Sequence, residues 1–222
     1  MNQRFERLIS LIGEDYFKKI QNSKVCVVGL GGVGGTCALT LARCGVGSII
    51  IMDFDKVQES NINRQLIAKV TNIGSFKTDV LEREIKEINP DCNVIKVTER
   101  FDSNSSLFDN QFDYLVDCID SVNDKLLLIK TCQEKGISFI SSMGTAKKLN
   151  PKSLEITKIS KTSYDPLAKV IRRKMKELKI KDFQVLSSTE EPEPIETLGS
   201  YMPVTSTAGL LLADYVIKEL IK

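Results

Sequence analysis

The sequence predicts an α/β fold in which helices cover both faces of a mostly parallel β-sheet. Short apolar runs rich in Val and Ile alternate along the chain with segments of helix length. The first of these runs passes directly into a glycine-rich turn. The 222 residues, 42% of them hydrophobic, suffice for one large domain with a sizeable core and exclude a chain that is disordered throughout.

The expected elements alternate from the amino terminus onward. An amino-terminal helix is expected near residues 4–20. Strands are expected at residues 24–29, 48–53, 93–97, 112–118 and 137–142, and helices near residues 32–44, 75–88 and 121–135. Because helices separate most of these strands, the strands can lie parallel in one sheet.

The pattern changes after Asn150. Residues 153–160 (SLEITKIS) alternate like an antiparallel or edge strand, and residues 165–180 form a basic helix entered through Asp165 and Pro166. A Pro- and Glu-rich loop at 187–200 precedes an apolar closing helix at 205–220. The chain has no internal repeat or linker. We therefore expect one domain over 1–222, with a nucleotide-binding core at 1–145 and an elaborated extension at 146–222.

Composition excludes several kinds of chemistry. The chain has no histidine, which removes the commonest general base and metal ligand. Its six cysteines form no CxxC pair, so we expect reduced, mostly structural thiols and no zinc. A charged amino terminus and the lack of about 18 consecutive apolar residues predict a soluble, cytoplasmic protein.

The glycine-rich turn indicates a nucleotide. In VCVVGLGGVGG, an apolar strand runs into Gly29, Gly31, Gly32 and Gly34, whose backbone NH groups can face phosphates. Asp53 ends the second expected strand, nineteen residues beyond Gly34, where a carboxylate can bind ribose hydroxyls. These features predict a Rossmann-like nucleotide site and suit NAD and ATP equally.

The segment after Asp53 favours a triphosphate. It carries Asn61, Asn63, Arg64 and Gln65 within DFDKVQESNINRQ, and Lys77 follows thirteen residues beyond Arg64. Two cations can neutralise the charge that develops during phosphoryl or nucleotidyl transfer, without histidine. Each cation taken alone also fits a surface or helix-capping role.

The segment DCIDSVNDK, residues 117–125, places Asp117 and Asp120 at the carboxyl end of the fourth expected strand. Asp120 offers a hard oxygen ligand for Mg²⁺ beside the phosphates. The alternative for Asp120 is the N-cap of the helix that begins near Ser121.

Five motifs in one order carry a family resemblance: GLGGVGG, DFDKVQESNINRQ, GSFKTDV, INPDC and DCIDSVNDK. They resemble the ATP-dependent superfamily of ubiquitin-activating and sulfur-carrier-activating enzymes, which adenylate a carboxylate. The resemblance implies ATP as the nucleotide, ribose contact by Asp53, and Asp120 at Mg²⁺ and the α-phosphate. The phosphate contacts that it implies are Gly31, Gly32, Asn61, Arg64 and Lys77. The full expected nucleotide site is Gly29, Gly31, Gly32, Gly34, Asp53, Asp55, Asn61, Asn63, Arg64, Gln65, Lys77, Asp120 and Ser121.

The amino-terminal segment RFERLISLIG adds a partner to this expectation. It resembles the segment that, in homodimeric members, lends an arginine to the partner's ATP, and Arg7 is the matching position. The resemblance therefore implies a homodimer in which Arg7 is catalytic together with Arg64, Lys77 and Asp120. A plain amphipathic helix would need only the apolar spacing.

The carboxyl-terminal third is similar to the tRNA threonylcarbamoyladenosine dehydratases, members of the same superfamily. The similar segments are ISSMGTAKKLNP, ITKISKTSYDPLAKVIRRKMKELKI and the closing MPVTSTAGLLLADYVIKELI. The resemblance implies that ATP adenylates the carboxylate of threonylcarbamoyladenosine beside the anticodon. The group then closes on itself and releases AMP, with net loss of water. Because this attack is intramolecular, no enzyme thiol is required.

A basic segment suits a tRNA partner. Residues 147–181 hold twelve Lys and Arg against three acidic residues, although the net charge of the whole chain is only +2. The cations expected to track tRNA phosphates are Lys169, Arg172, Arg173, Lys174, Lys176 and Lys179. Lys147, Lys148 and Lys161 are expected to extend this surface. A helix that needs charge only for solubility is the alternative.

Three other functions stay open from the sequence. A ThiF- or MoeB-type activator would adenylate the carboxyl terminus of a sulfur-carrier protein, but the missing zinc cysteines and the basic helix disfavour it. The Arg64 and Lys77 pair disfavours an NAD-dependent oxidoreductase, and a non-catalytic nucleotide-binding scaffold would release no AMP.

Cys118 closes a buried strand and is expected to pack rather than react. The resemblance also raises Na⁺ or K⁺ as a cofactor and a sulfur-relay protein as a partner.

Overall fold

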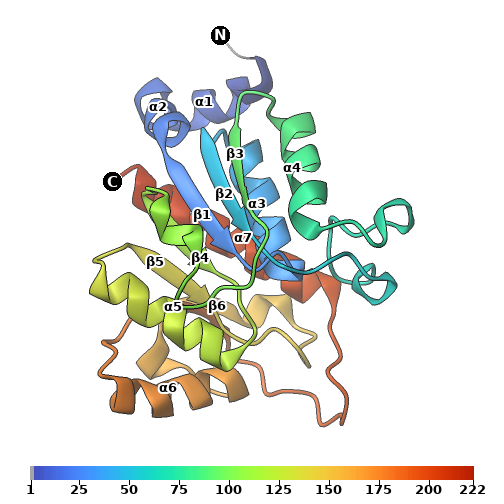
Figure 1. Ribbon diagram of the computed structural model, residues 1–222, viewed down its shortest axis with the longest axis vertical. Coiled ribbons are helices and arrows are strands. Elements are labelled where there is room, and N and C mark those ends of the chain that lie inside the picture. Colours follow the sequence, from blue (N-terminus) through green and yellow to red (C-terminus); the bar gives the residue numbers. More distant parts are fainter. Residues whose placement is uncertain (1–2) are drawn as a thin grey trace.

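A seven-stranded sheet forms the centre of the computed structural model, which describes residues 3–222 (Figure 1). The strand order is β3-β2-β1-β4-β5-β7-β6, and only β6 runs antiparallel to its neighbour. The strands are β1 (Lys24–Val28), β2 (Ser48–Met52), β3 (Asn93–Val97), β4 (Tyr114–Asp117), β5 (Phe139–Ser142), β6 (Leu154–Lys158) and β7 (Gln184–Ser188). The predicted α/β fold class is confirmed.

Helices cover both faces of this sheet. They are α1 (Glu6–Ile12), α2 (Glu14–Asn22), α3 (Gly32–Arg43), α4 (Lys77–Ile88), α5 (Val122–Glu134), α6 (Pro166–Leu178) and α7 (Met202–Leu220). Val25 and Val27 of β1 pack with α3, α4 and α7, whereas Cys26 and Val28 pack with α5 on the other face. The central strands are therefore apolar on both faces, as expected of a buried parallel sheet.

The order of the strands creates a crevice at the carboxyl ends of β1 and β4, in the middle of the sheet. From β1 the chain moves outward through β2 to β3, and it then returns to place β4 on the other side of β1. The connections after β1 and β4 leave in opposite directions, which opens a space at the carboxyl ends of these strands. Ligands of such sheets bind at this switch point.

Three elements differ from the sequence prediction. The expected single helix at 4–20 forms as two helices, because Gly13 adopts φ +87° and separates α1 from α2. Strand β7 was missed, and its last two residues, Ser187 and Ser188, fall within the expected loop. Helix α7 begins at Met202, three residues early, because Pro203 is accommodated in its first turn.

Within residues 3–222, no helix combines the length and the hydropathy that a membrane span requires.

Candidate nucleotide-binding site

A cavity of about 570 Å³ lies at the predicted switch point of the sheet. It is bordered by the residues that follow β1, β2 and β4. The expected site residues that line it are Gly29, Gly31, Gly32, Gly34, Asp53, Asp55, Asn61, Arg64, Gln65, Lys77 and Asp120. Residues far apart in the sequence are therefore brought to one place.

The glycine-rich turn forms one wall of the cavity. A Cβ at Gly34 would lie 1.8 Å from the Gly29 carbonyl oxygen, and one at Gly32 would lie 2.6 Å from the Arg64 carbonyl oxygen. A Cβ at Gly31 would meet only Gln65 Nε2, at 3.9 Å. Gly31 therefore leaves free space beside the first turn of α3, whose leading NH groups have no partner within the helix. This cradle fits an anionic group such as a phosphate.

Asp53 and Lys77 form the floor of the cavity. Asp53 accepts hydrogen bonds from the backbone NH of Leu30 (2.7 Å) and of Asp55 (2.8 Å), so it fastens the glycine-rich turn to the end of β2. Lys77 begins α4, and its Nζ lies 2.7 Å from Asp55 Oδ2 and 3.7 Å from Asp53 Oδ2. The Lys77 side chain is only 6% exposed. Its charge is therefore held in place beside two carboxylates.

Arg64 and Gln65 form a second wall. The Arg64 guanidinium donates from Nη1 to the carbonyl oxygen of Ser60 (2.6 Å) and to Asn63 Oδ1 (3.0 Å). Gln65 is buried, and its Oε1 has no hydrogen-bond partner within residues 3–222. A buried polar atom without a partner is costly, which indicates that a ligand group belongs next to Gln65.

Asp120 is exposed at the cavity on the loop between β4 and α5. The N-cap alternative for Asp120 is wrong, since α5 begins at Val122 and Ser121 precedes it. The loop is anchored by Asp117, which accepts from the backbone NH of Ile119 (3.0 Å) and from Ser141 Oγ (2.6 Å).

A buried ion pair completes this anchor. Lys125 Nζ lies 2.7 Å from Asp117 Oδ2, and both side chains are 0% exposed. Lys125 also donates to Ser141 Oγ at 3.0 Å. The charges of Asp117 and Lys125 are thus committed to holding the Asp120 loop.

Three expected site residues do not line the cavity: Asn63, Ser121 and Arg7. Asn63 Nδ2 instead donates to the carbonyl oxygen of Ser200 at 3.3 Å. Arg7 is exposed on α1, and α1 lies at the end of the sheet opposite to α6 (Figure 1). Arg7 is thus absent from the lining of the cavity in its own chain.

Other cavity residues were missed from the sequence. Arg100 follows β3, donates from Nε to Asp124 Oδ2 (2.9 Å), and places its guanidinium carbon 6.0 Å from the Phe54 ring centroid. Thr145 enters from the segment after β5. The rule that ligands lie beyond the carboxyl ends of strands, applied to β3 and β5, could have found them.

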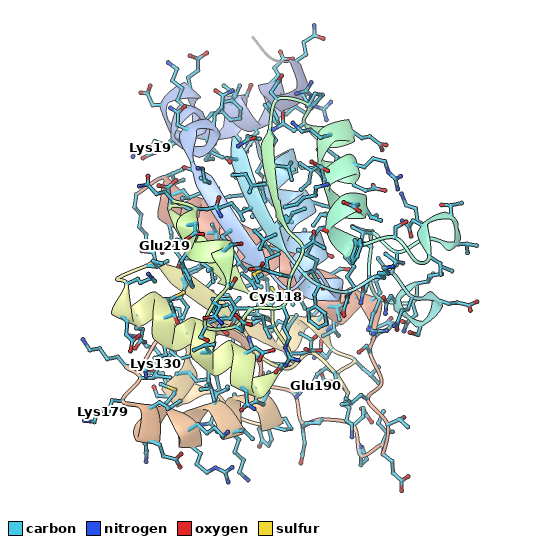
Figure 2. All side chains as sticks on the ribbon, viewed as in Figure 1. Lys19, Cys118, Lys130, Lys179, Glu190 and Glu219 are labelled. Carbon is cyan, nitrogen blue, oxygen red and sulfur yellow. The ribbon has the colours of Figure 1, made fainter. Side chains whose placement is uncertain are left out.

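The basic helix α6 buries Ala168, Ile171 and Met175. Of its cations, Lys169, Arg173 and Lys176 are exposed, whereas Arg172 and Lys174 are half-buried. Among the described residues, none of its Lys or Arg side chains pairs with a carboxylate within 4.0 Å. Lys179 ends the helix in a left-handed conformation and lies at the edge of the molecule (Figure 2). These cations are available to an external anion.

Lys148 does not extend this basic surface, contrary to expectation. It is 2% exposed, and its Nζ donates to the carbonyl oxygens of Tyr164 (3.3 Å) and Glu190. Burial lowers the pKa of Lys148. Lys148 therefore ties the segment after β5 to the loop that carries Glu190.

The cysteine thiols are poorly suited to act as nucleophiles. All six are free thiols, and Cys118 lies near the centre of the molecule (Figure 2). Burial, reinforced by the neighbouring Asp117, raises the pKa of Cys118 to about 12. Within residues 3–222, no three His, Cys, Asp or Glu side chains cluster to hold a metal. A cation at Asp120 would need ligands from a bound phosphate.

Comparisons with known proteins agree with this geometry. The ThiF family match spans residues 5–222. The tRNA threonylcarbamoyladenosine dehydratase of Bacillus subtilis (strain 168) is 37% identical over 244 residues, covering 100% of this chain and 96% of that protein. Crystal structures of the Escherichia coli tRNA N6-threonylcarbamoyladenosine dehydratase in complex with AMP and with ATP are 32% identical, with a TM-score of 0.92 for each. Each alignment covers 98% of this chain, and 94% and 93% respectively of the two crystallised chains.

Proposed function

Because the chain belongs to the ThiF family, we propose that it is an ATP-dependent tRNA threonylcarbamoyladenosine dehydratase. ATP adenylates the threonylcarbamoyl carboxylate, and the group then closes on itself with release of AMP. The observation that carries this proposal is the likeness over 96% of the length of the Bacillus subtilis dehydratase, which includes the extension after residue 146. The ATP and AMP complexes of the Escherichia coli dehydratase support the choice of nucleotide.

The residues that line the cavity suit both the phosphates and the ribose of ATP. The NH groups at Gly31 and the start of α3 cradle the phosphates, and Lys77 and Arg64 neutralise the charge that builds on the leaving pyrophosphate. Asp53 receives the ribose hydroxyls, because its oxygens retain lone pairs beyond the two backbone hydrogen bonds that they accept. The side-chain amide of Gln65 lies beside Arg64 in the cavity wall and can hydrogen-bond to the bound nucleotide.

Asp120 is the proposed protein ligand of Mg²⁺. The ion would supply charge neutralisation at the phosphates when bound. Asp120 fits that role because it is exposed to the cavity on a loop that the buried Asp117–Lys125 pair holds in place. Asp124 lies close by but is engaged by Arg100.

Ring closure needs positioning rather than a protein nucleophile. The attacking ureido group belongs to the same substituent as the activated carboxylate, and such intramolecular reactions reach effective molarities of about 10⁵ M or more. Burial raises the pKa of the Cys118 thiol, which agrees with a ring closure that needs no protein nucleophile. The Na⁺ or K⁺ cofactor and the sulfur-relay partner that the resemblance raises stay predictions.

We further propose a homodimer that completes each site. Arg7 lies on α1, remote from the cavity of its own chain, and is exposed. A role of Arg7 at ATP would therefore require it to enter the cavity of a second copy. An Arg7→Ala variant would lose adenylation while a mixture with an Arg64→Ala variant would regain part of it, because mixed dimers carry one complete site.

The basic helix is the proposed tRNA-binding surface. Its unpaired cations, including Lys169, Arg173 and Lys176, would contact backbone phosphates, so tRNA affinity should fall with salt by a log-log slope of about −0.7 to −0.9 per phosphate. An Arg172→Ala, Arg173→Ala, Lys174→Ala triple variant should weaken binding and flatten that slope. An unchanged slope would contradict this role of α6.

Mass spectrometry of tRNA nucleosides tests the whole proposal. After incubation with ATP, threonylcarbamoyladenosine in tRNA should be converted into its dehydrated cyclic form, with one AMP released per product. ATP-dependent pyrophosphate exchange should require the modified tRNA. Exchange that appears instead with a protein ending in Gly-Gly would assign the chain to sulfur-carrier activation.

A further inference from the structure

A second cavity lies beside the carboxyl-terminal half of α6, and we propose that it receives one unstacked nucleotide of the substrate tRNA. This inference rests on the proposed function and adds a base-binding subsite to it. The cavity has a volume of about 560 Å³, within the range of about 300–1,000 Å³ that is typical of small-molecule sites.

The floor of this second cavity is apolar. Ile159, Met175 and Ile180 contribute to it, and each is at least nine-tenths buried. Such a floor can accept the face of a base that has left its stack. Unstacked bases in RNA loops are the usual targets of proteins that read RNA.

The rim of the cavity is cationic. Arg172, Arg173 and Lys176 line it, and none of the three pairs with a carboxylate among the described residues. The one acidic rim residue, Asp182, is already engaged by the backbone NH (3.2 Å) and Oγ (2.8 Å) of Ser160. The rim therefore complements a phosphate, and the floor complements the attached base.

Arg172 is oriented before any ligand arrives. Its Nη1 donates to the carbonyl oxygen of Thr162 (3.1 Å) and to Thr162 Oγ1. The guanidinium plane is thereby fixed beside the cavity, while its other NH groups stay available. Fixed guanidinium planes are among the surfaces on which RNA-binding proteins stack bases.

Helix α6 connects this cavity to the nucleotide site. Leu167 lines the first cavity, and Arg172 and Lys176 line the second. At 1.5 Å per residue, they lie about 8 Å and 14 Å further along the helix axis. A nucleotide adjacent in the strand to the modified adenosine, or next but one, can span this distance. An RNA single strand is thus favoured over an unconnected ligand.

A stem-loop with a fluorescent base tests the subsite. An anticodon stem-loop that carries threonylcarbamoyladenosine is prepared with 2-aminopurine at one loop position at a time. Wild-type protein should change the fluorescence strongly at one position near the modified base. The Arg173→Glu, Lys176→Glu variant should abolish that change even at saturating protein.

The matched control makes the same charge change outside the cavity. Lys169 and Lys174 lie on α6 but not at the rim, so Lys169→Glu, Lys174→Glu removes equal charge. The control variant should keep the fluorescence change at saturation. The rim variant should bind about 5- to 150-fold more weakly than the control, as expected for losing one stacked base.

Two outcomes overturn the inference, and they differ in what else they overturn. If wild-type protein cyclises the stem-loop with ATP but no position responds, or both variants respond alike, only the subsite fails. If wild-type protein forms no cyclic product, the proposed function fails with it.

Discussion

Replacing Lys125 with methionine should destabilise the protein by about 3–5 kcal/mol. Lys125 and Asp117 form an ion pair at 2.7 Å with both side chains fully buried, and methionine keeps the length of the side chain without its charge. The Asp117 carboxylate would keep only Ser141 Oγ and the Ile119 NH as partners. An uncompensated buried charge is the main reason for the expected loss. For a domain of this size, it corresponds to a fall in Tm of about 6–20 °C.

Urea and thermal unfolding measure this loss, with a surface lysine as the control. Lys96 lies 2.9 Å from Asp79 and 2.7 Å from Glu82, but its side chain is 34% exposed. Lys96→Met should therefore change the free energy of unfolding by no more than about 1 kcal/mol. Adding Asp117→Asn to Lys125→Met should restore part of the stability, because it removes the stranded charge. Equal effects of Lys125→Met and Lys96→Met would refute the reasoning.

Three further predictions concern the cavity and its surroundings. Lys77→Ala should lower the rate of AMP formation about 10²- to 10³-fold, whereas Lys69→Ala, which removes a surface partner of Glu84, should not; an equal fall in both rates would contradict the role of Lys77. Cys118→Ala should retain activity, and iodoacetamide at pH 8 should not act through this thiol, because burial raises its pKa to about 12; a tenfold loss of activity would contradict this. Burial raises the pKa of Asp165 above its ordinary value of 3.8, so its stabilisation is fully present below pH 3.8 and is lost as the pH rises through the folded-state pKa. The wild-type urea midpoint minus the midpoint of the Asp165→Asn variant should therefore decrease between pH 3.5 and pH 6. A difference that stays constant over this range would contradict the prediction for Asp165.

The elements that the sequence predicts well are those whose burial is uniform. Strands β1 and β2 are apolar on both faces, so their ends were predicted to within one residue. Strand β7 was missed because its polar residues are as buried as its apolar ones: Ser187 is 3% exposed and Ser188 is 1% exposed. Position within the sheet, rather than hydrophobicity, defines β7.

The site residues likewise divide into those that could be predicted from the sequence and those that could not. Residues placed by a local turn or by the end of a strand, such as Gly31 and Asp53, could be assigned from spacing. Lys148 could not, because nothing local distinguishes a lysine enclosed by Tyr164 and Glu190 from one on the surface. Partners that meet only through tertiary folding leave no periodic signal in the sequence.

The nucleotide cavity is completed by the last helix of the chain to be synthesised. Thr205, in the first turn of α7, lines the cavity and donates from Oγ1 to the carbonyl oxygen of Arg64, 141 residues earlier in the chain. A nascent chain that has emerged only through β5 already holds the glycine turn but lacks this wall. The wall that Thr205 contributes is therefore completed only after the final helix has been synthesised and has packed against the segment that carries Arg64.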